Sequence, residues 1–391
     1  MDDGIDNKKI KEFEELSRSL RLSLVKTSYH RSDINAILVE IYEKGASDLH
    51  LQSDDYAKIK YQRDLIPISH RILTDSEVKG FIKEIYGENA TAEINIGKDI
   101  NTSHAINMAD GSVIRFRVNA IGVFSAGGDG IQITIRTIQS KPLKLSVLKL
   151  EDEIWNNFVP DQGLIIVTGP TGSGKTTLMS SCIREILEDK YGSKKIVTYE
   201  QPIEFVYNEI DKGNNIITQT EVPKNIKTFD EAVESSMRRA PNIIFIGESR
   251  DKATIMNSIL ASQTGHLVYT TAHTNSAAET VRRMINVFSP EERNSLQYDL
   301  IDSLKMIVAQ RLIRDVNNKS IAIREYLVFT SQIKDHLKKV DANNVSAEIK
   351  RIVIAKKQTL FDDALRKYKA GLISIDVLRA LEKDYRSWYY F

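Results

Sequence analysis

The chain has 391 residues, of which 41% are hydrophobic and 27% charged, with 54 lysines and arginines against 53 aspartates and glutamates. This length suffices for two or three domains with cores of their own. The formal net charge of +1 excludes a global field that would steer the protein to nucleic acid or anionic lipid, and leaves only a local basic patch open. The single cysteine, Cys182, excludes an intramolecular disulfide and a cysteine-based zinc site, which fits a reducing cytoplasm.

The first 30 residues have the composition of a polar leader. Phe13, Leu16, Leu20 and Leu22 give them a narrow apolar stripe of helical spacing, but charges are spread throughout, so we expect no signal peptide. No run in the chain approaches the length of a transmembrane helix, about 18 apolar residues. We therefore expect a cytoplasmic protein that reaches a membrane only through its partners.

Residues 31–141 predict a smaller α+β domain with a mostly antiparallel sheet. Apolar residues recur at helical spacing from Ile34 to Tyr42, with Ser32 or Asp33 as the candidate N-cap. The predicted elements are a second helix over 76–86 and strands over 47–52, 58–62, 112–119 and 130–136, with a hairpin connection through the glycines of 127–130. A linker is expected over residues 142–160.

Residues 161–330 show strands that alternate with helices. Short apolar runs predict strands over 164–167, 196–199, 243–246 and 267–269, and Phe229, Val233 and Met237 have helical spacing between two of them. This alternation predicts an α/β fold with a mainly parallel sheet, helices on both faces and a ligand at the carboxyl ends of the strands. Residues 331–391 predict charged helices. We expect the aromatic residues 388–391 to pack on the protein's own core, with partner docking as the alternative.

A phosphate-binding loop follows the first of these strands. It consists of Gly169, Pro170, Thr171, Gly172, Ser173, Gly174, Lys175 and Thr176, with Thr177 next. Its glycines let backbone N–H groups surround phosphates, Lys175 would reach the β- and γ-phosphates, and the Thr176 hydroxyl would ligate Mg²⁺. A chance match is the alternative, but the strand before the loop and the helix after it are the required context. The sequence therefore predicts a site for ATP and Mg²⁺.

Polar residues follow the remaining predicted strands. Residues 198–205 include two glutamates, residues 243–251 form an apolar strand that ends in an acid, and residues 264–275 include two histidines. The segment 243–251 has the pattern of a Walker B element. The first domain carries three arginines on predicted strands, at positions 115, 117 and 136, and alternation places the first two on one face.

Taken together, these stretches resemble the secretion-superfamily ATPases, the hexameric motors of type II and type IV secretion and of type IV pilus extension and retraction. The resemblance covers most of the chain, from Gly45 to Tyr326. It is nearest to the ATPases of type IVB secretion and IncI-type conjugation, and residues 115–119, 131–138, 247–251, 273–275 and 324–329 carry it. It implies a RecA-like ATPase domain preceded by a PAS-like domain.

The resemblance also implies a role for each candidate residue. Glu204 aligns with the general base, Glu200 would assist Mg²⁺ or water, and Glu248 would hold Mg²⁺ through a water. His273 would sense the γ-phosphate, with His266 as the second histidine of the same box. Charge neutralisation in the transition state is assigned to Arg115, Arg117 and Arg136. Without such roles, these residues would be surface carboxylates, packed core histidines and solvent-facing strand arginines.

Two positions depart from the family pattern. Gln201 and Asn242 stand where the family usually has acids. They motivate one rival function, that of an assembly factor that binds ATP without hydrolysing it. A pilus retraction or assembly motor is the second rival function. The third is a nucleic-acid translocase, which would show salt-dependent binding.

The interpretation that the resemblance favours is a homohexameric ATP hydrolase at the cytoplasmic side of an inner-membrane secretion or conjugation complex. ATP would lie between the two domains. A secreted-substrate adaptor is a further partner that it allows, and no direct nucleic-acid binding is expected.

Overall fold

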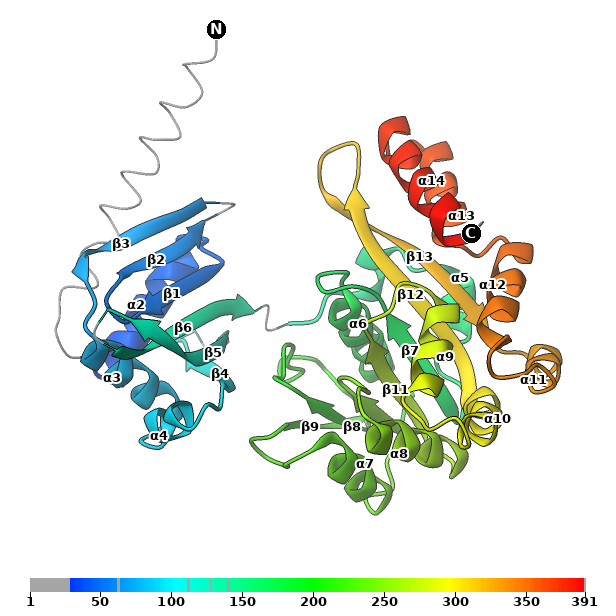
Figure 1. Ribbon diagram of the computed structural model, residues 1–391, viewed down its shortest axis with the longest axis horizontal. Coiled ribbons are helices and arrows are strands. Elements are labelled where there is room, and N and C mark those ends of the chain that lie inside the picture. Colours follow the sequence, from blue (N-terminus) through cyan, green and yellow to red (C-terminus); the bar gives the residue numbers. More distant parts are fainter. Residues whose placement is uncertain (1–28, 62–63, 111–112, 127, 139–140, 390–391) are drawn as a thin grey trace, which may run out of the picture. The chain divides into compact units, whose positions relative to one another are not determined.

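The computed structural model describes residues 29–61, 64–110, 113–126, 128–138 and 141–389, with the backbone alone over 384–389 (Figure 1). Contacts divide the chain into two units, Met1–Ser140 and Lys141–Phe391, and each is described by itself. The expected leader helix and the side chains of the aromatic C-terminal residues lie outside the described residues.

The first unit is built on a six-stranded sheet in the order β3-β2-β1-β6-β5-β4, and every pair in it is antiparallel. Its strands are β1 (Asp48–Gln52), β2 (Tyr56–Tyr61), β3 (Asp64–Ile72), β4 (Ile100–Asn107), β5 (Val113–Ser125) and β6 (Gly128–Ile138). The antiparallel prediction is confirmed. Strands β5 and β6 pair from Ser125 opposite Gly128, so residues 128–130, which were expected in the hairpin connection, belong to β6.

Three helices cover one face of this sheet: α2 (Arg31–Glu43), α3 (Asp75–Tyr86) and α4 (Ala90–Asn95). The N-cap of helix α3 is Thr74, whose side chain forms a reciprocal capping box with Glu77. Helix α2 begins earlier than expected, because its N-cap is His30 and Asp33 is the N3 residue that closes a capping box with it. The prediction of Ser32 or Asp33 as the N-cap was therefore wrong.

The strands missed by sequence analysis in this unit are β3 and β4, the two edges of the sheet. Strand β3 contains Pro67, and β4 carries Asn101, Ser103 and Asn107. An edge strand has no neighbour on one side and tolerates proline and polar residues, so it lacks the pattern of a central strand.

The second unit is a seven-stranded sheet in the order β13-β12-β7-β11-β10-β8-β9, parallel throughout except for the β12–β13 pair. The strands are β7 (Gly163–Thr168), β8 (Lys195–Glu200), β9 (Ile216–Glu221), β10 (Ile243–Ile246), β11 (Leu267–Ala272), β12 (Leu304–Arg314) and β13 (Ser320–Val328). The mainly parallel α/β fold is confirmed. Strand β9 and the β12–β13 hairpin were not predicted.

Helices lie on both faces of this sheet (Figure 1). Alternate residues of β7 point to opposite faces: Ile165 and Val167 pack with helix α6 (Lys175–Leu187), while Leu164 and Ile166 pack in the other cluster. That second cluster includes residues of α7 (Phe229–Met237), α8 (Lys252–Gln263), α9 (Ala277–Asn286), α10 (Arg293–Ser303), α11 (Ser331–Leu337) and α12 (Val345–Ala355). Strand β7, which precedes the phosphate-binding loop (P-loop), is thus buried on both of its faces.

The predicted charged helices after residue 330 are confirmed. Beyond α11 and α12 the chain forms α13 (Leu360–Lys369) and α14 (Ile375–Tyr389), which pack with Ile323 of β13 in a small cluster. The expected linker segment contains the 3-10 helix η1 (Leu145–Leu148) and α5 (Asp152–Asn156), and both pack in the second unit. Among the described residues, no helix is both long and apolar enough to span a membrane.

Candidate nucleotide site

The P-loop connects the end of β7 to the start of α6, as the motif requires. Gly169, Gly172 and Gly174 all have positive φ angles, of 150°, 78° and 81°. Side-chain-bearing residues rarely adopt these backbone angles, and a Cβ on Gly169 would lie 2.3 Å from the Gln310 carbonyl oxygen. The loop therefore depends on glycine for both its conformation and its packing.

The Lys175 side chain folds back over the loop that carries it. Its Nζ donates to the carbonyl oxygens of Gly169 at 2.8 Å and Pro170 at 3.1 Å. Burial lowers the pKa of Lys175, and the nearby carboxylates of Glu248 and Glu204 act in the opposite direction. These two carboxylates are thus close enough to the ammonium group to affect it, as expected for residues around one phosphate site.

Glu248 lies just after β10 and faces two groups. Its Oε2 pairs with the guanidinium of Arg250 and lies 3.5 Å from His273 Nε2. Burial lowers the pKa of His273, helped by the positive charge of Lys175, so the imidazole is mostly neutral near pH 7. A neutral His273 can donate or accept a hydrogen bond at the phosphate.

Threonines hold His273 beside the P-loop strand. Thr168, the last residue of β7, contacts Thr274 through their hydroxyl oxygens at 2.6 Å and accepts from the Thr274 backbone N at 3.0 Å. On the other side, Arg283 of α9 donates to the His273 carbonyl oxygen at 2.9 Å. Sequence analysis missed Arg283, because its position on α9 gives no sign that it faces the end of β11.

The two predicted glutamates come at and after the end of β8. Glu200 is 6% exposed, and its Oε1 accepts from Thr198 Oγ1 at 2.7 Å and from Gln219 Nε2 at 3.2 Å. Glu204 is half-buried on the following loop. Glu204 is thus less enclosed than Glu200, and it lies close enough to Lys175 to act on the pKa of that lysine.

Two residues of the prediction lie at the opposite end of the sheet. His266 comes before β11, and its Nδ1 lies 3.0 Å from the Ala261 carbonyl oxygen. A six-residue strand, about 20 Å long, separates it from the carboxyl end where His273 lies. The expected pairing of the two histidines at the phosphate is thus corrected. Asn242 precedes β10, and its side chain accepts from Lys195 N at 2.7 Å at the start of β8. The position where the family usually has an acid therefore lies away from the P-loop, at the other end of the strands.

The three arginines belong to the polar face of the first unit's sheet. Arg117 and Arg136 are direct cross-strand partners, and Arg136 Nε donates to Asp48 Oδ1 at 2.6 Å. Arg115 lies two residues before Arg117 on the same face and is 6% exposed. The intervening Phe116 packs in the core on the other face. The predicted common face is confirmed, while the finger role stays a prediction.

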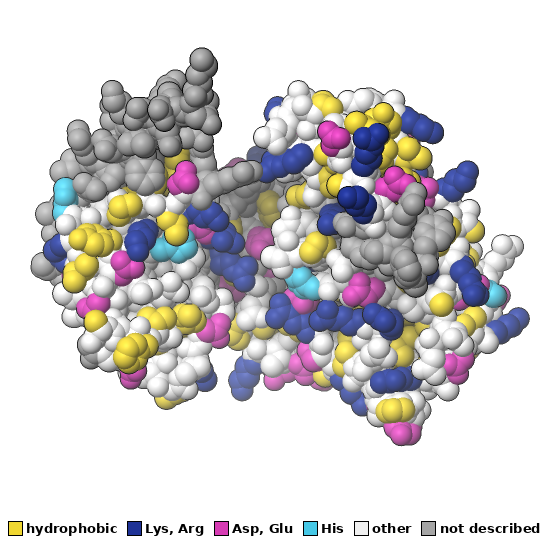
Figure 2. Space-filling view, turned by 45° about the horizontal axis from the view of Figure 1, so that its top comes forward, with side chains coloured by type: hydrophobic (Ala, Val, Ile, Leu, Met, Phe, Trp, Pro, Cys, Tyr) yellow, Lys and Arg dark blue, Asp and Glu magenta, His cyan; other side chains and the backbone are white. Residues whose placement is uncertain are grey.

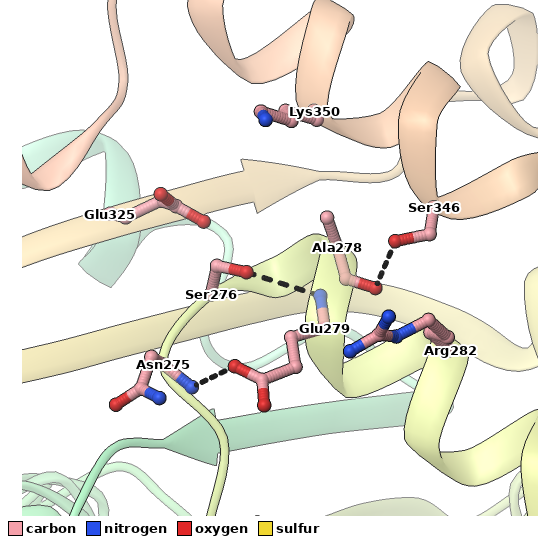
Figure 3. Close-up of a pocket in the computed structure, with 8 residues that line it drawn as sticks. All are labelled: Asn275, Ser276, Ala278, Glu279, Arg282, Glu325, Ser346 and Lys350. Atoms are coloured by element: carbon pink, nitrogen blue, oxygen red, sulfur yellow. Dashed lines mark hydrogen bonds between the residues drawn. The ribbon is translucent and has the colours of Figure 1, made fainter. Parts of the chain in front are cut away.

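A cavity of about 260 Å³ lies beside the His273 loop, between the start of α9, strand β13 and helix α12 (Figure 3). It is lined by Asn275, Ser276, Ala278, Glu279, Arg282, Glu325, Ser346 and Lys350. Glu325 is 1% exposed and its Oε1 accepts from the Ala277 N at 2.8 Å, while its Oε2 has no partner among the described residues. Burial raises the pKa of Glu325 to about 8, so this acid is mostly protonated at neutral pH.

The residues around the P-loop fit a nucleoside triphosphate with its metal. The buried Ser173 hydroxyl has no partner among the described residues. The Lys175 ammonium donates to the carbonyl oxygens of Gly169 and Pro170, which a phosphate would replace. The half-buried Thr176 and the carboxylate of Glu248 are oxygen ligands of the kind that Mg²⁺ prefers.

Comparison with known proteins identifies the family of this chain. The family model described as "Type II/IV secretion system protein" matches residues 25–369. The chain belongs to this family. The Type IV pilus retraction ATPase PilT of Pseudomonas aeruginosa is 33% identical over 303 residues, which are 78% of this chain and 84% of that protein. The family resemblance seen in the sequence is confirmed, and the chain is an ATP-binding ATP hydrolase.

Solved structures extend the similarity to both units of this ATPase. The X-ray structure of the Legionella pneumophila ATPase DotB has a TM-score of 0.86 and 37% identity, and covers 92% of this chain and 97% of DotB. The crystal structure of the pilus retraction motor PilT with bound ADP has a TM-score of 0.76 and 27% identity, and covers 88% of this chain and 95% of that one.

Proposed function

We propose that this ATPase is a homohexameric motor of a type IVB secretion or conjugation system, docked from the cytoplasm on the inner-membrane base of that system. The observation that carries the proposal is the likeness to DotB over nearly the whole length of both chains. It agrees with the type IVB-like motifs at residues 115–119 and 247–251. A substrate adaptor would be a partner of the same assembly.

In the proposed reaction, Lys175 binds the β- and γ-phosphates after it leaves the carbonyl oxygens of Gly169 and Pro170. Thr176 and Glu248 would hold Mg²⁺, which neutralises phosphate charge when bound. Glu204 orients and deprotonates the attacking water, with Glu200 behind it. His273 contacts the γ-phosphate and Arg117 supplies positive charge from the first unit.

The departure at Gln201 does not remove a required carboxylate from this scheme. Gln201 is exposed, whereas Glu200 and Glu204 are both present at the end of β8. Hydrolysis is therefore favoured over the non-hydrolysing assembly factor. The formal net charge of +1 favours a protein-docking motor over a nucleic-acid translocase. Figure 2 shows both basic and acidic side chains on the face drawn.

Light scattering coupled to size exclusion tests the ring. We expect ATPase activity to elute with a mass near six times the 44.3 kDa of the chain. An active monomer would reject the hexamer.

A genetic test separates the two transport roles. The gene is deleted in its bacterium and complemented with the wild type or with Glu204→Gln. The proposal expects that only the wild type restores secretion or conjugative transfer, while pilus-dependent motility is unaffected by the deletion. Lost motility with normal transfer would instead support a pilus retraction motor, the second candidate, which the 33% identity to PilT favours.

A further inference from the structure

A buried line of hydrogen bonds leads away from the P-loop. Gln310 of β12 donates from Nε2 to the Ser173 carbonyl oxygen at 2.8 Å, and its Oε1 accepts from Arg324 Nε at 2.8 Å. Gln310 and Arg324 are cross-strand partners in the β12–β13 hairpin, and they are 4% and 2% exposed. One amide group thus joins the phosphate-binding loop to a buried arginine.

The loop is packed tightly against Gln310 at both of its ends. A Cβ on Gly169 would lie 2.3 Å from the Gln310 carbonyl oxygen, and a Cβ on Gly174 would lie 3.0 Å from Gln310 Nε2. Contacts this close leave little free space, so a rearrangement of the loop must also displace Gln310.

The far end of the line reaches the segment that enters this unit from the first one. Arg324 donates from Nη1 to Glu151 Oε2 at 2.9 Å and from Nη2 to the Leu148 carbonyl oxygen at 3.2 Å. The same segment is held near its start by Arg184 of α6, which donates to the Pro142 carbonyl oxygen at 2.7 Å. Helix α6 begins at Lys175, so both contacts connect the segment 141–151 to the P-loop and its helix.

A second branch reaches the C-terminal helices. Asp363 of α13 is 3% exposed at its side chain and accepts from the Arg324 backbone N at 2.8 Å. Lys367, one turn along α13, donates to Asp363 at 2.5 Å and lies 3.5 Å from Glu151 Oε1. Arg324 therefore lies in a network of fixed charges that includes two carboxylates from different segments.

We propose that Gln310 and Arg324 are positioning residues that couple the conformation of the P-loop to the segment 141–151. A buried arginine that separates from its carboxylate leaves an unpaired charge, so Arg324 and Glu151 move together. The Gln310 amide is rigid, with its donor on the loop and its acceptor on Arg324, so a displacement at Ser173 reorients both bonds. Nucleotide phosphates that draw Lys175 away from Gly169 would start this displacement.

The adjacent turn offers a matched control. Glu153 lies two residues after Glu151 and also accepts from β13, through Tyr326 Oη at 2.7 Å, and from Gln358 Nε2 at 3.1 Å. This contact anchors α5, which directly follows the segment 141–151, to the same strand, but it does not involve Gln310 or the P-loop.

The experiment is amide hydrogen exchange of the full chain with and without ADP and Mg²⁺. It compares the wild type with Glu151→Ala, Glu153→Ala and Gln310→Met. We expect nucleotide to change exchange over residues 141–151 in the wild type and in Glu153→Ala, and we expect this response to be lost in Glu151→Ala and Gln310→Met. Calorimetry on the same variants should show that each still binds ADP, so that a lost exchange response reports lost coupling and not an empty nucleotide site.

Steady-state kinetics give a second readout. For Glu151→Ala we expect kcat to fall about fivefold or more, while KM changes little. For Glu153→Ala we expect no fall in kcat of this kind. The proposal is overturned if nucleotide does not change amide exchange over residues 141–151 in the wild type. It is also overturned if Glu151→Ala keeps the full exchange response, or if Glu153→Ala loses this response to the same extent. Gln310→Met tests the P-loop end of the line separately, should Glu151→Ala not fold.

Discussion

The Nζ of Lys175 donates to the carbonyl oxygen of Gly169 at 2.8 Å, so the P-loop lysine is bound by its own loop. A phosphate must replace this contact with a stronger, charge-assisted one. The strength of nucleotide binding therefore depends on the charge of Lys175.

Lys175→Ala should weaken ATP binding by about 100-fold, because a hydrogen bond between charged groups contributes up to about 3 kcal/mol. Calorimetry with ATP and Mg²⁺ measures this loss. Lys190→Ala, which removes an exposed lysine shortly after α6, serves as the control and should bind like the wild type. Unchanged affinity in Lys175→Ala would remove the P-loop assignment.

Glu204→Gln should bind ATP but turn it over at least about 100-fold more slowly, the lower end of the contribution of a general base. Phosphate release and nucleotide affinity are measured on the same sample. Glu209→Gln, an exposed acid later on the same loop, should keep wild-type turnover. If Glu204→Gln is as active as the wild type, the base is another group, and Glu200 is the next to test.

Arg117→Ala should lower turnover by about 10³-fold if this arginine neutralises charge in the transition state. Its effect on nucleotide affinity should be small, because the interaction is made in the transition state and not in the ground state. Lys58→Ala, on the same face of the first unit's sheet, is the control. Equal losses in turnover and affinity would assign Arg117 to ground-state binding.

Glu325→Gln should change how stability depends on pH. The folded protein holds the Glu325 proton to about pH 8, whereas the unfolded chain releases it near pH 4.5, so the wild type loses stability as pH rises between these values and stays level above them. The variant lacks this loss, which amounts to about 1.4 kcal/mol for each unit of pKa shift. Chemical denaturation from pH 5 to pH 9 measures it.

The stability gap in favour of Glu325→Gln should therefore widen from pH 5 to pH 8 and level off above. A gap that is the same at every pH would show that Glu325 is ionised in the folded protein. Glu279→Gln, a substitution in the same cavity, serves as the control.

Patterns among neighbouring residues predicted the elements whose sequence signal lies within a few residues of the chain. The P-loop, the strands that end at Thr168 and Ile246, and the helix after Lys175 follow from residues adjacent in the chain. The strands of the first unit that alternate between core and polar face, such as β5, were predicted for the same reason. Edge strands β3 and β4 were missed, because Pro67 interrupts the one and because buried positions of the other are occupied by polar residues such as Thr102 and His104.

The amino-acid sequence by itself thus determined the fold class, the phosphate-binding chemistry and the choice of candidate acids. Only the tertiary structure decided which of them meet. It placed His273 beside Glu248 and His266 a full strand away, and it brought Gln310 and Arg324 between the P-loop and Glu151. The physical reason is that strand order and register, set by packing of the whole sheet, bring together residues more than 100 positions apart in the chain.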